Sequence, residues 1–351
     1  MNVLIRTAGG AAKKRELGLG HIYRTANLAQ EFKGHNIYFL IEDYGGAKNI
    51  LNFFKFNKIF KIPTESDISR DVKLTLSIVK TKKIDVVIID KFKVNKKYVS
   101  NIKKYVKTVV ISDLENIEYN ADLLICGFIG YKNKITKNKF KTKCLLGPRY
   151  QILNKNFKKK NSTKKKKFEL LATFGGFDEQ NISSQLISSI MNNTLEIKTK
   201  IILGPSTKNN LKIDTKKNKK ILQIKKQTKN MYEEMQEVRF GLCSGGLTTY
   251  EFASLGIPFG IICQNFHQLK TAREWEKRGI GFNLGLISKR TPIKIKSFIE
   301  SISKNKMRKI KSGYVDGLGT KRIVKEILKL NNSSSLQKYS YTNSRSQDNE
   351  Y

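Results

Sequence analysis

The sequence contains few cysteines, few histidines and no long apolar run. Its cysteines are Cys126, Cys144, Cys243 and Cys263, which form no C-x-x-C pair and lack zinc-site spacing. They are typical of a reducing cytosol. No apolar run approaches the roughly 20 residues of a membrane-spanning helix. The opening residues, MNVLIRTAGG, lack the charged start and apolar region of a signal peptide. We therefore expect a cytoplasmic protein.

Acidic residues are scarce compared with basic ones. The chain has 68 Lys and Arg against 29 Asp and Glu, a formal net charge of +39. Such an excess favours polyanions, anionic lipid head groups or phosphorylated substrates. Compositional drift explains it equally well, because Lys, Asn and Ile are abundant throughout. The densest basic run has little aromatic interleaving, so we expect no specific nucleic-acid partner. Peripheral contact with an anionic membrane and the oligomeric state stay open.

The length of 351 residues suits two domains. Short runs rich in Val, Ile and Leu alternate with helical patterns in both halves, which indicates parallel sheets covered by helices. The lysine-rich residues 154–167 separate the halves. The sequence thus predicts two α/β, Rossmann-like, doubly wound parallel-sheet domains at 1–153 and 168–330, and a disordered tail at 331–351. Strands are expected at 2–5, 37–41, 84–89, 108–111, 123–126, 169–174, 200–203, 221–224, 240–243 and 258–263.

Three predicted strand-to-helix turns are rich in glycine: LGLGHIYR at 17–24, FGGFD at 174–178 and CSGGLTTYE at 243–251. Glycine lets backbone N–H groups approach a ligand, and a helix N-terminus attracts phosphate. The first turn lacks the third glycine of a dinucleotide fingerprint, and there is no P-loop lysine. Because ligands bind beyond the carboxyl ends of such strands, the turns predict a phosphate-binding cleft between the domains.

Together these motifs resemble those of the GT-B nucleotide-sugar enzymes. The matching stretches occur in family order: LGLGHIYRTANLAQEF, VVIIDKF, LLGPRYQIL, ATFGGFDEQN, CSGGLTTYEFASLGIP and CQNFHQLKTAREWEKRG. LLGPRYQIL and FGGFD indicate the branch of the UDP-2,4-diacetamido-2,4,6-trideoxy-β-L-altropyranose hydrolase of pseudaminic acid biosynthesis. SGGLTTYE followed by HQ is shared with family 28 glycosyltransferases, such as the muramyl-pentapeptide N-acetylglucosaminyltransferase.

The resemblance implies roles for particular residues. His21 would be the general base at the anomeric carbon, and an imidazole titrates near the operating pH, at about 6.5 in water. From their positions at the ends of predicted strands, Asp90 or Asp113 could orient His21 or the sugar. Glu251 would hold the ribose. The implied binding residues are Gly20, Arg24, Gly175, Gly176, Ser244, Gly245, Gly246, Leu247, Thr248, Thr249, Glu251 and Gln268. No metal and no cofactor are expected, because helix N-termini would stabilise the departing diphosphate.

The chain departs from the hydrolase pattern in two places. The hydrolases usually carry an aspartate shortly after the first strand, where this sequence has a predicted turn at Thr7–Gly10. They also tend to have Asp-His-Tyr at positions 90–92, where this sequence has Asp-Lys-Phe. The implied function is hydrolysis of a UDP-activated amino or deoxy sugar for surface polysaccharide or nonulosonic acid biosynthesis. An inverting glycosyltransferase and a non-catalytic sugar-nucleotide-binding paralogue are the alternatives.

Overall fold

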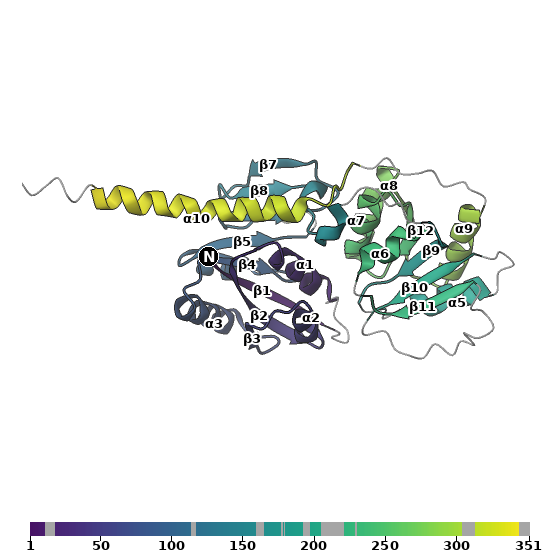
Figure 1. Ribbon diagram of the computed structural model, residues 1–351, viewed down its shortest axis with the longest axis horizontal. Coiled ribbons are helices and arrows are strands. Elements are labelled where there is room, and N and C mark those ends of the chain that lie inside the picture. The colour runs from purple at the N-terminus through teal and green to yellow at the C-terminus, as the bar shows by residue number, and fades with distance from the viewer. Residues whose placement is uncertain are drawn as a thin grey trace, which may run out of the picture.

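The computed structural model describes residues 1–10, 18–113, 117–158, 165–176, 178, 180–191, 197–204, 221–228, 230–303 and 313–343. Within them the chain forms two α/β domains that lie next to each other along the long axis of the molecule (Figure 1). Each domain is built around its own parallel sheet, with helices on both faces. The predicted fold class is therefore confirmed.

The first sheet has eight strands in the order β3-β2-β1-β4-β5-β6-β8-β7, and only the β7–β8 pair is antiparallel. Its core strands are buried on both faces, which explains their unbroken runs of Val, Ile and Leu. Helices α1 and α2 pack on one face, and α3 and α4 pack on the other. The elements are β1 (Asn2–Gly10), α1 (Gly20–Ala29), β2 (Asn36–Tyr44), α2 (Ala47–Phe53), β3 (Ile59–Ile62), α3 (Ile68–Thr81), β4 (Val86–Asp90), α4 (Lys96–Lys103), β5 (Lys107–Ile111), β6 (Leu123–Cys126), β7 (Lys134–Lys137) and β8 (Lys143–Leu146).

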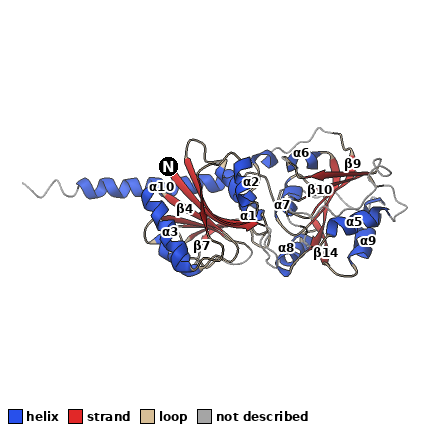
Figure 2. Cartoon of the chain, turned by 90° about the horizontal axis from the view of Figure 1, so that it is seen from below, coloured by secondary structure: helices blue, strands red, loops and turns tan. Residues whose placement is uncertain are grey.

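The second sheet has six parallel strands in the order β11-β10-β9-β12-β13-β14. Counted from its own first strand, this order is 3-2-1-4-5-6, the same as in the first six strands of the other sheet. Figures 1 and 2 both place α1 and α7 at the junction between the sheets. The elements are β9 (Phe168–Thr173), α5 (Ile182–Met191), β10 (Thr199–Leu203), β11 (Leu222–Lys226), α6 (Met231–Gln236), β12 (Val238–Cys243), α7 (Leu247–Ser254), β13 (Phe259–Cys263), α8 (Phe266–Lys277), β14 (Gly281–Leu286) and α9 (Thr291–Ser303).

Each predicted strand overlaps an observed one, but the sequence reading missed β3, β7, β8 and β14. β3, β7 and β14 are edge strands with exposed or half-buried residues, so their apolar signal is weak, and β8 has only four residues, of which three are buried. The predicted turn at Thr7–Gly10 is wrong. These residues extend β1 and pair with β2 as far as Gly10 opposite Tyr44. The small side chains allow this continuation, and residues 11–17 lie outside the described part.

The last helix, α10 (Gly319–Asn343), returns to the first domain (Figure 1). Its residues Ile323, Val324 and Ile327 are buried in the same core cluster as the α1 side of β1. Residues 319–330 were predicted to belong to the second domain. This prediction is wrong, because the apolar face of the helix packs against the first sheet. The helix also extends through 331–343, where disorder was predicted. That stretch contains neither Gly nor Pro to stop a helix, and 344–351 lie outside the described residues.

The predicted linker at 154–167 is not solvated throughout. A short 3₁₀ helix covers Lys155–Lys158, and within it Phe157 is buried with its ring centroid 5.5 Å from that of Tyr232 in the second domain. The charge of the surrounding lysines hid this anchor in the sequence. Residues 159–164 lie outside the described part.

Candidate functional site

A cavity of about 740 Å³ opens between the two domains at the carboxyl ends of their strands. In each sheet the strand order reverses direction between the first and fourth strands, which is the usual ligand position in doubly wound folds. His21 follows β1 and Asp90 ends β4 in the first sheet. Gly175 follows β9 and Ser244 follows β12 in the second. The cavity therefore joins the switch points of both domains.

Most of the predicted site residues come together around this cavity. Those that line it are Gly20, His21, Arg24, Gly175, Gly176, Ser244, Gly245, Gly246, Leu247, Thr248, Glu251 and Gln268. The two domains touch within this set, since a Cβ on Gly176 would come within 3.0 Å of Leu19 Cδ1. Asp90 is not part of the cavity lining, but it contacts His21 and Arg24, which are.

Thr249 does not face the cavity, so its predicted contact with phosphate is wrong. Its Oγ1 donates to the carbonyl of Gly246 at 2.7 Å and accepts from Trp275 Nε1 at 3.0 Å. Thr249 is fully buried, and these two hydrogen bonds hold its hydroxyl inside the second domain. Thr248 keeps its place in the lining.

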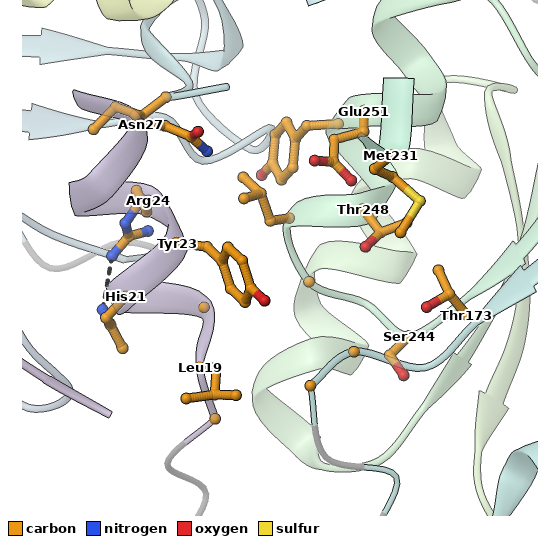
Figure 3. Close-up of a pocket in the computed structure, with 18 of the residues that line it drawn as sticks. Leu19, His21, Tyr23, Arg24, Asn27, Thr173, Met231, Ser244, Thr248 and Glu251 are labelled. Carbon is orange, nitrogen blue, oxygen red and sulfur yellow. Dashed lines mark hydrogen bonds between the residues drawn. The ribbon is translucent and has the colours of Figure 1, made fainter. Parts of the chain in front are cut away.

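His21 is held by a buried carboxylate. Its Nδ1 lies 2.7 Å from Asp90 Oδ1, and its side chain is 13% exposed while that of Asp90 is fully buried. Arg24 Nη2 lies 3.0 Å from the same Nδ1 (Figure 3). The two contacts require opposite states of Nδ1, because a guanidinium can only donate to it and a carboxylate can only accept from it. The contact with Asp90 is the shorter one, and Arg24 Nη2 already donates to Asp90 Oδ1 at 2.6 Å, so we assign the proton to Nδ1, which donates to Asp90. The Nε2 lone pair is then left available for a proton.

Arg24 ties two carboxylates together. It donates to Asp90 from Nε at 2.8 Å and from Nη2 at 2.6 Å, and to Asp113 Oδ1 from Nη1 at 2.6 Å. Burial alone would raise the pKa of both aspartates, but the charges of Arg24 and His21 outweigh it. They hold the pKa of Asp90 below its ordinary value and that of Asp113 well below its usual range. Both carboxylates therefore stay ionised at neutral pH.

Two helices begin at the cavity without a side-chain cap. The N-cap residues are Leu19 for α1 and Gly246 for α7, and neither supplies a capping hydrogen bond. By contrast, Asp67, Asn95, Asn230 and Asn265 cap α3, α4, α6 and α8. The first N–H groups of α1 and α7 therefore remain for a ligand, and the helix dipoles favour a negative one. Arg24 is the only Lys or Arg in the described lining, and its charge is already paired.

The glycine loop before α7 is fixed by two glutamines, Gln264 between β13 and α8 and Gln268 in the first turn of α8. Gln268 Oε1 accepts from the N–H of Gly245 at 3.3 Å and from that of Gln264 at 2.9 Å. Gln264 Nε2 donates to Ser244 Oγ at 2.7 Å and to the carbonyl of Phe174 at 2.9 Å. Gly245 cannot carry a side chain, because a Cβ would lie 2.7 Å from Gln268 Cβ. The side-chain oxygen Oε1 of Gln268 thus holds the loop in place, and only the side-chain nitrogen Nε2 remains for a ligand.

Glu251 lies one turn into α7 and points into the cavity (Figure 3). Within the described residues its carboxylate has neither a hydrogen-bond partner nor an ion pair, and burial raises its pKa to about 7. A half-buried carboxylate without a partner is costly unless a ligand supplies donors. A vicinal diol, such as that of a ribose, supplies two.

Sequence reasoning left out several lining residues. Tyr23 packs edge-on against Phe54, with ring centroids 6.2 Å apart, and forms an aromatic wall beside His21. Phe92 of the first domain meets His267 of the second at 6.2 Å, edge to face. Gln264 lies in the motif CQNFHQ, from which only Gln268 was predicted as a binding residue. The aromatic residues could not be recognised as lining residues, because in the sequence they cannot be told apart from residues of the hydrophobic core.

The described residues contain no cluster of three or more His, Cys, Asp or Glu side chains suited to a metal. Among the described helices, none combines the length and apolarity needed to cross a bilayer. The expectations on peripheral membrane contact and on nucleic acid stay predictions, and the oligomeric state stays open.

Two curated proteins are similar in sequence to this chain, and no family model matches it. An uncharacterized protein of Methanocaldococcus jannaschii is 28% identical over 296 residues, 79% of this chain but only 59% of the relative's own length. The spore coat polysaccharide biosynthesis protein SpsG of Bacillus subtilis is 24% identical over 300 residues, covering 82% of this chain and 84% of SpsG.

Solved structures resemble the whole molecule. Acinetobacter baumannii MurG superimposes with a TM-score of 0.63 at 14% identity, over 93% of this chain and 99% of that one. A UDP-GlcNAc 2-epimerase from M. jannaschii, in complex with UDP-GlcNAc and UDP, gives a TM-score of 0.57 at 14% identity with the same coverage. The chain therefore has the two-domain GT-B fold, and the match to SpsG supports the branch of nucleotide-sugar enzymes that its motifs indicate.

Proposed function

We propose that this protein is a UDP-sugar hydrolase. It would cleave the bond between the anomeric carbon and the diphosphate of an amino or deoxy sugar nucleotide, for surface polysaccharide or nonulosonic acid biosynthesis. The observation that carries the proposal is the pairing across one cavity of a carboxylate-held imidazole, His21, with the uncapped N-terminus of α7. The first can accept a proton from a nucleophile, and the second can stabilise a departing diphosphate.

The nucleotide would lie along the second domain. The N–H groups at the start of α7, with the hydroxyls of Ser244 and Thr248, would bind the diphosphate, and Glu251 would accept hydrogen bonds from the ribose diol. UDP as the nucleotide is supported by the epimerase of the same fold, which was solved with UDP, and by the SpsG-like motifs. The sugar would then lie between α7 and the start of α1, with its anomeric carbon near His21 Nε2.

Negative charge develops on the bridging oxygen as the bond to the anomeric carbon breaks. Backbone donors fixed before the reaction stabilise this charge without having to reorganise, and removing one such donor from an enzyme typically costs about 10²- to 10³-fold in kcat. Arg24 does not serve this purpose, since its donors are directed at Asp90 and Asp113. The second domain would therefore act through its backbone and the first through His21.

The test is UDP release by the purified protein from a panel of UDP-sugars without any acceptor. The panel includes UDP-2,4-diacetamido-2,4,6-trideoxy-β-L-altropyranose. We expect release of both UDP and free sugar. If UDP binds but is released from no member of the panel, hydrolysis is contradicted. UDP release that begins only when acceptor sugars are added would establish the glycosyltransferase alternative. Binding without turnover under either condition would indicate the non-catalytic paralogue, and no UDP binding would overturn the nucleotide assignment.

The affinity for UDP should depend on pH through Glu251. The ribose diol donates to the carboxylate, so only the ionised form binds well, and burial sets the pKa of the free protein at about 7. Lowering the pH from 8 to 6 should therefore weaken UDP binding about tenfold by calorimetry. Glu251→Gln removes this titration but leaves that of the terminal phosphate, which protonates near pH ~6. An unchanged pH profile in the variant would contradict the assignment.

A further inference from the structure

A second carboxylate faces the free nitrogen of His21. Asp113 Oδ2 lies 3.9 Å from His21 Nε2, on the side of the ring away from Asp90. The Asp113 side chain is 32% exposed, and both residues line the cavity. The separation is too long for a direct hydrogen bond. Two acceptors thus face the same small volume at the edge of the cavity.

The gap has the dimensions of one bridging water. Hydrogen bonds of ~2.8 Å to each acceptor span 3.9 Å with an angle of roughly 90° at the water oxygen. We propose that His21 and Asp113 together bind the attacking water, and that Asp113 thereby selects water over a sugar hydroxyl as the nucleophile. This inference rests on the proposed hydrolase function and adds to it a catalytic residue and the identity of the acceptor.

The two acceptors have different tasks. Asp113 is held by Arg24 at 2.6 Å and stays ionised, so it accepts a hydrogen bond without taking the proton. His21 Nε2 takes the proton as the water oxygen forms its bond to the anomeric carbon. The bond from that carbon to the diphosphate oxygen breaks, and its electron pair leaves with UDP. The other proton of the water remains on the new anomeric hydroxyl, and His21 later returns its proton to solvent.

The charges of the cluster favour this direction of transfer. With His21 neutral, the single cation of Arg24 faces the two anions of Asp90 and Asp113. Protonation of His21 brings the half-buried cluster to neutrality. The imidazolium formed in the transition state is therefore stabilised by carboxylates on both of its nitrogens.

Selection for water follows from counting donors. A water carries two O–H groups and satisfies both His21 and Asp113. An alcohol carries one, so binding it loses either the hydrogen bond to His21 Nε2 or the one to Asp113 Oδ2, although Asp113 keeps its contact with Arg24. A glycosyltransferase with this pair of residues would favour hydrolysis over transfer to its acceptor, unless the acceptor displaced Asp113.

The experiment measures how the glycosyl group partitions between water and methanol, with UDP-2,4-diacetamido-2,4,6-trideoxy-β-L-altropyranose as the probe. Free sugar and methyl glycoside are quantified in the same reaction, so their ratio is independent of how much enzyme is folded. We expect Asp113→Ala to lower kcat by about 10²-fold, with KM changed less, and to raise the methyl glycoside share about tenfold. Asp113→Asn, which keeps one acceptor oxygen, should lie between this variant and the wild type.

Asp122→Asn is the matched control. This carboxylate binds the backbone N–H of Thr108 at the opposite end of β5, away from the cavity, so its partition ratio should equal that of the wild type. A wild-type ratio in Asp113→Ala, with hydrolysis intact, would overturn the inference and leave the proposed function standing. Failure of the wild-type enzyme to release UDP from the panel would instead overturn the proposed function itself.

Discussion

His21→Asn should lower kcat for UDP release by about 10³-fold, within the 10²–10⁴ typical of a lost general base. Asparagine is chosen because its amide nitrogen lies close to the position of Nδ1, so it can still donate to Asp90, which lies 2.7 Å from Nδ1 in the wild type. What it removes is Nε2, the atom proposed to take the proton. The affinity for UDP should change less than ~3-fold, since α7 and Glu251 are untouched.

Single-turnover kinetics with calorimetry of UDP binding separates these two quantities. The control is His35→Asn, the same change at a histidine that packs against Phe32 and does not line the cavity. It should retain wild-type kcat. A His21→Asn enzyme with more than about a tenth of wild-type kcat would show that the proton goes elsewhere, and equal losses in both variants would point to a general structural effect.

The parts of this site that could be predicted from sequence are those marked by a short local motif. Glycine pairs directly after apolar strands place Gly175, Gly176, Gly245 and Gly246 at the cavity, because in a parallel sheet the turn after a strand always emerges at the same edge. The histidine after LGLG follows the same rule. Its glycines leave open space, since a Cβ on Gly20 would meet no protein atom within 4 Å.

The parts that could not be predicted depend on contacts between distant positions. Arg24 meets Asp90 and Asp113 across 66 and 89 residues, and nothing near Arg24 in the sequence indicates either partner. The return of α10 to the first domain is of the same kind. Its apolar face would fit either sheet, and only the assembled fold shows which sheet lacks cover. The prediction for Thr249 failed because its hydroxyl contacts the carbonyl of Gly246 and Trp275 Nε1, and the contact with Trp275 joins positions 26 residues apart.

Arg24→Met should destabilise the protein by about 3–5 kcal/mol at neutral pH, the usual cost of breaking a buried ion pair by removing one partner. The substitution leaves the fully buried carboxylate of Asp90 close to Asp113 with no cation between them. Two carboxylates that share a site repel, so at least one pKa should rise above its ordinary value. Catalysis should be lost as well, because the Asp90 acceptor that orients His21 would become protonated or move.

The pH dependence fixes the sign of this effect. In the wild type both folded-state pKa values are lowered, so the stability they contribute is present at neutral pH and is lost only as the pH falls below the ordinary value of about 4. In Arg24→Met at least one of the two aspartates has a folded-state pKa above its ordinary value. That carboxylate destabilises the folded protein when the pH is above the ordinary value, and it costs no stability once it is protonated in both states. Urea unfolding should therefore show the gap between variant and wild type widening from pH 4 to pH 7.

Arg6→Met separates stability from function. Arg6 is fully buried, whereas the Arg24 side chain is 13% exposed; Arg6 pairs with Asp71 at 2.7 Å and with Glu42 at 3.3 Å and does not line the cavity. Its loss should also destabilise the fold, by less than the loss of Arg24, because Lys91 still pairs with Glu42 at 3.2 Å and with Asp71 at 3.3 Å; His21 keeps its partners. If the folded fraction of Arg6→Met is active and that of Arg24→Met is not, Arg24 positions the catalytic histidine. If both are equally active, its two ion pairs serve stability alone, and Asp90 holds His21 without its help.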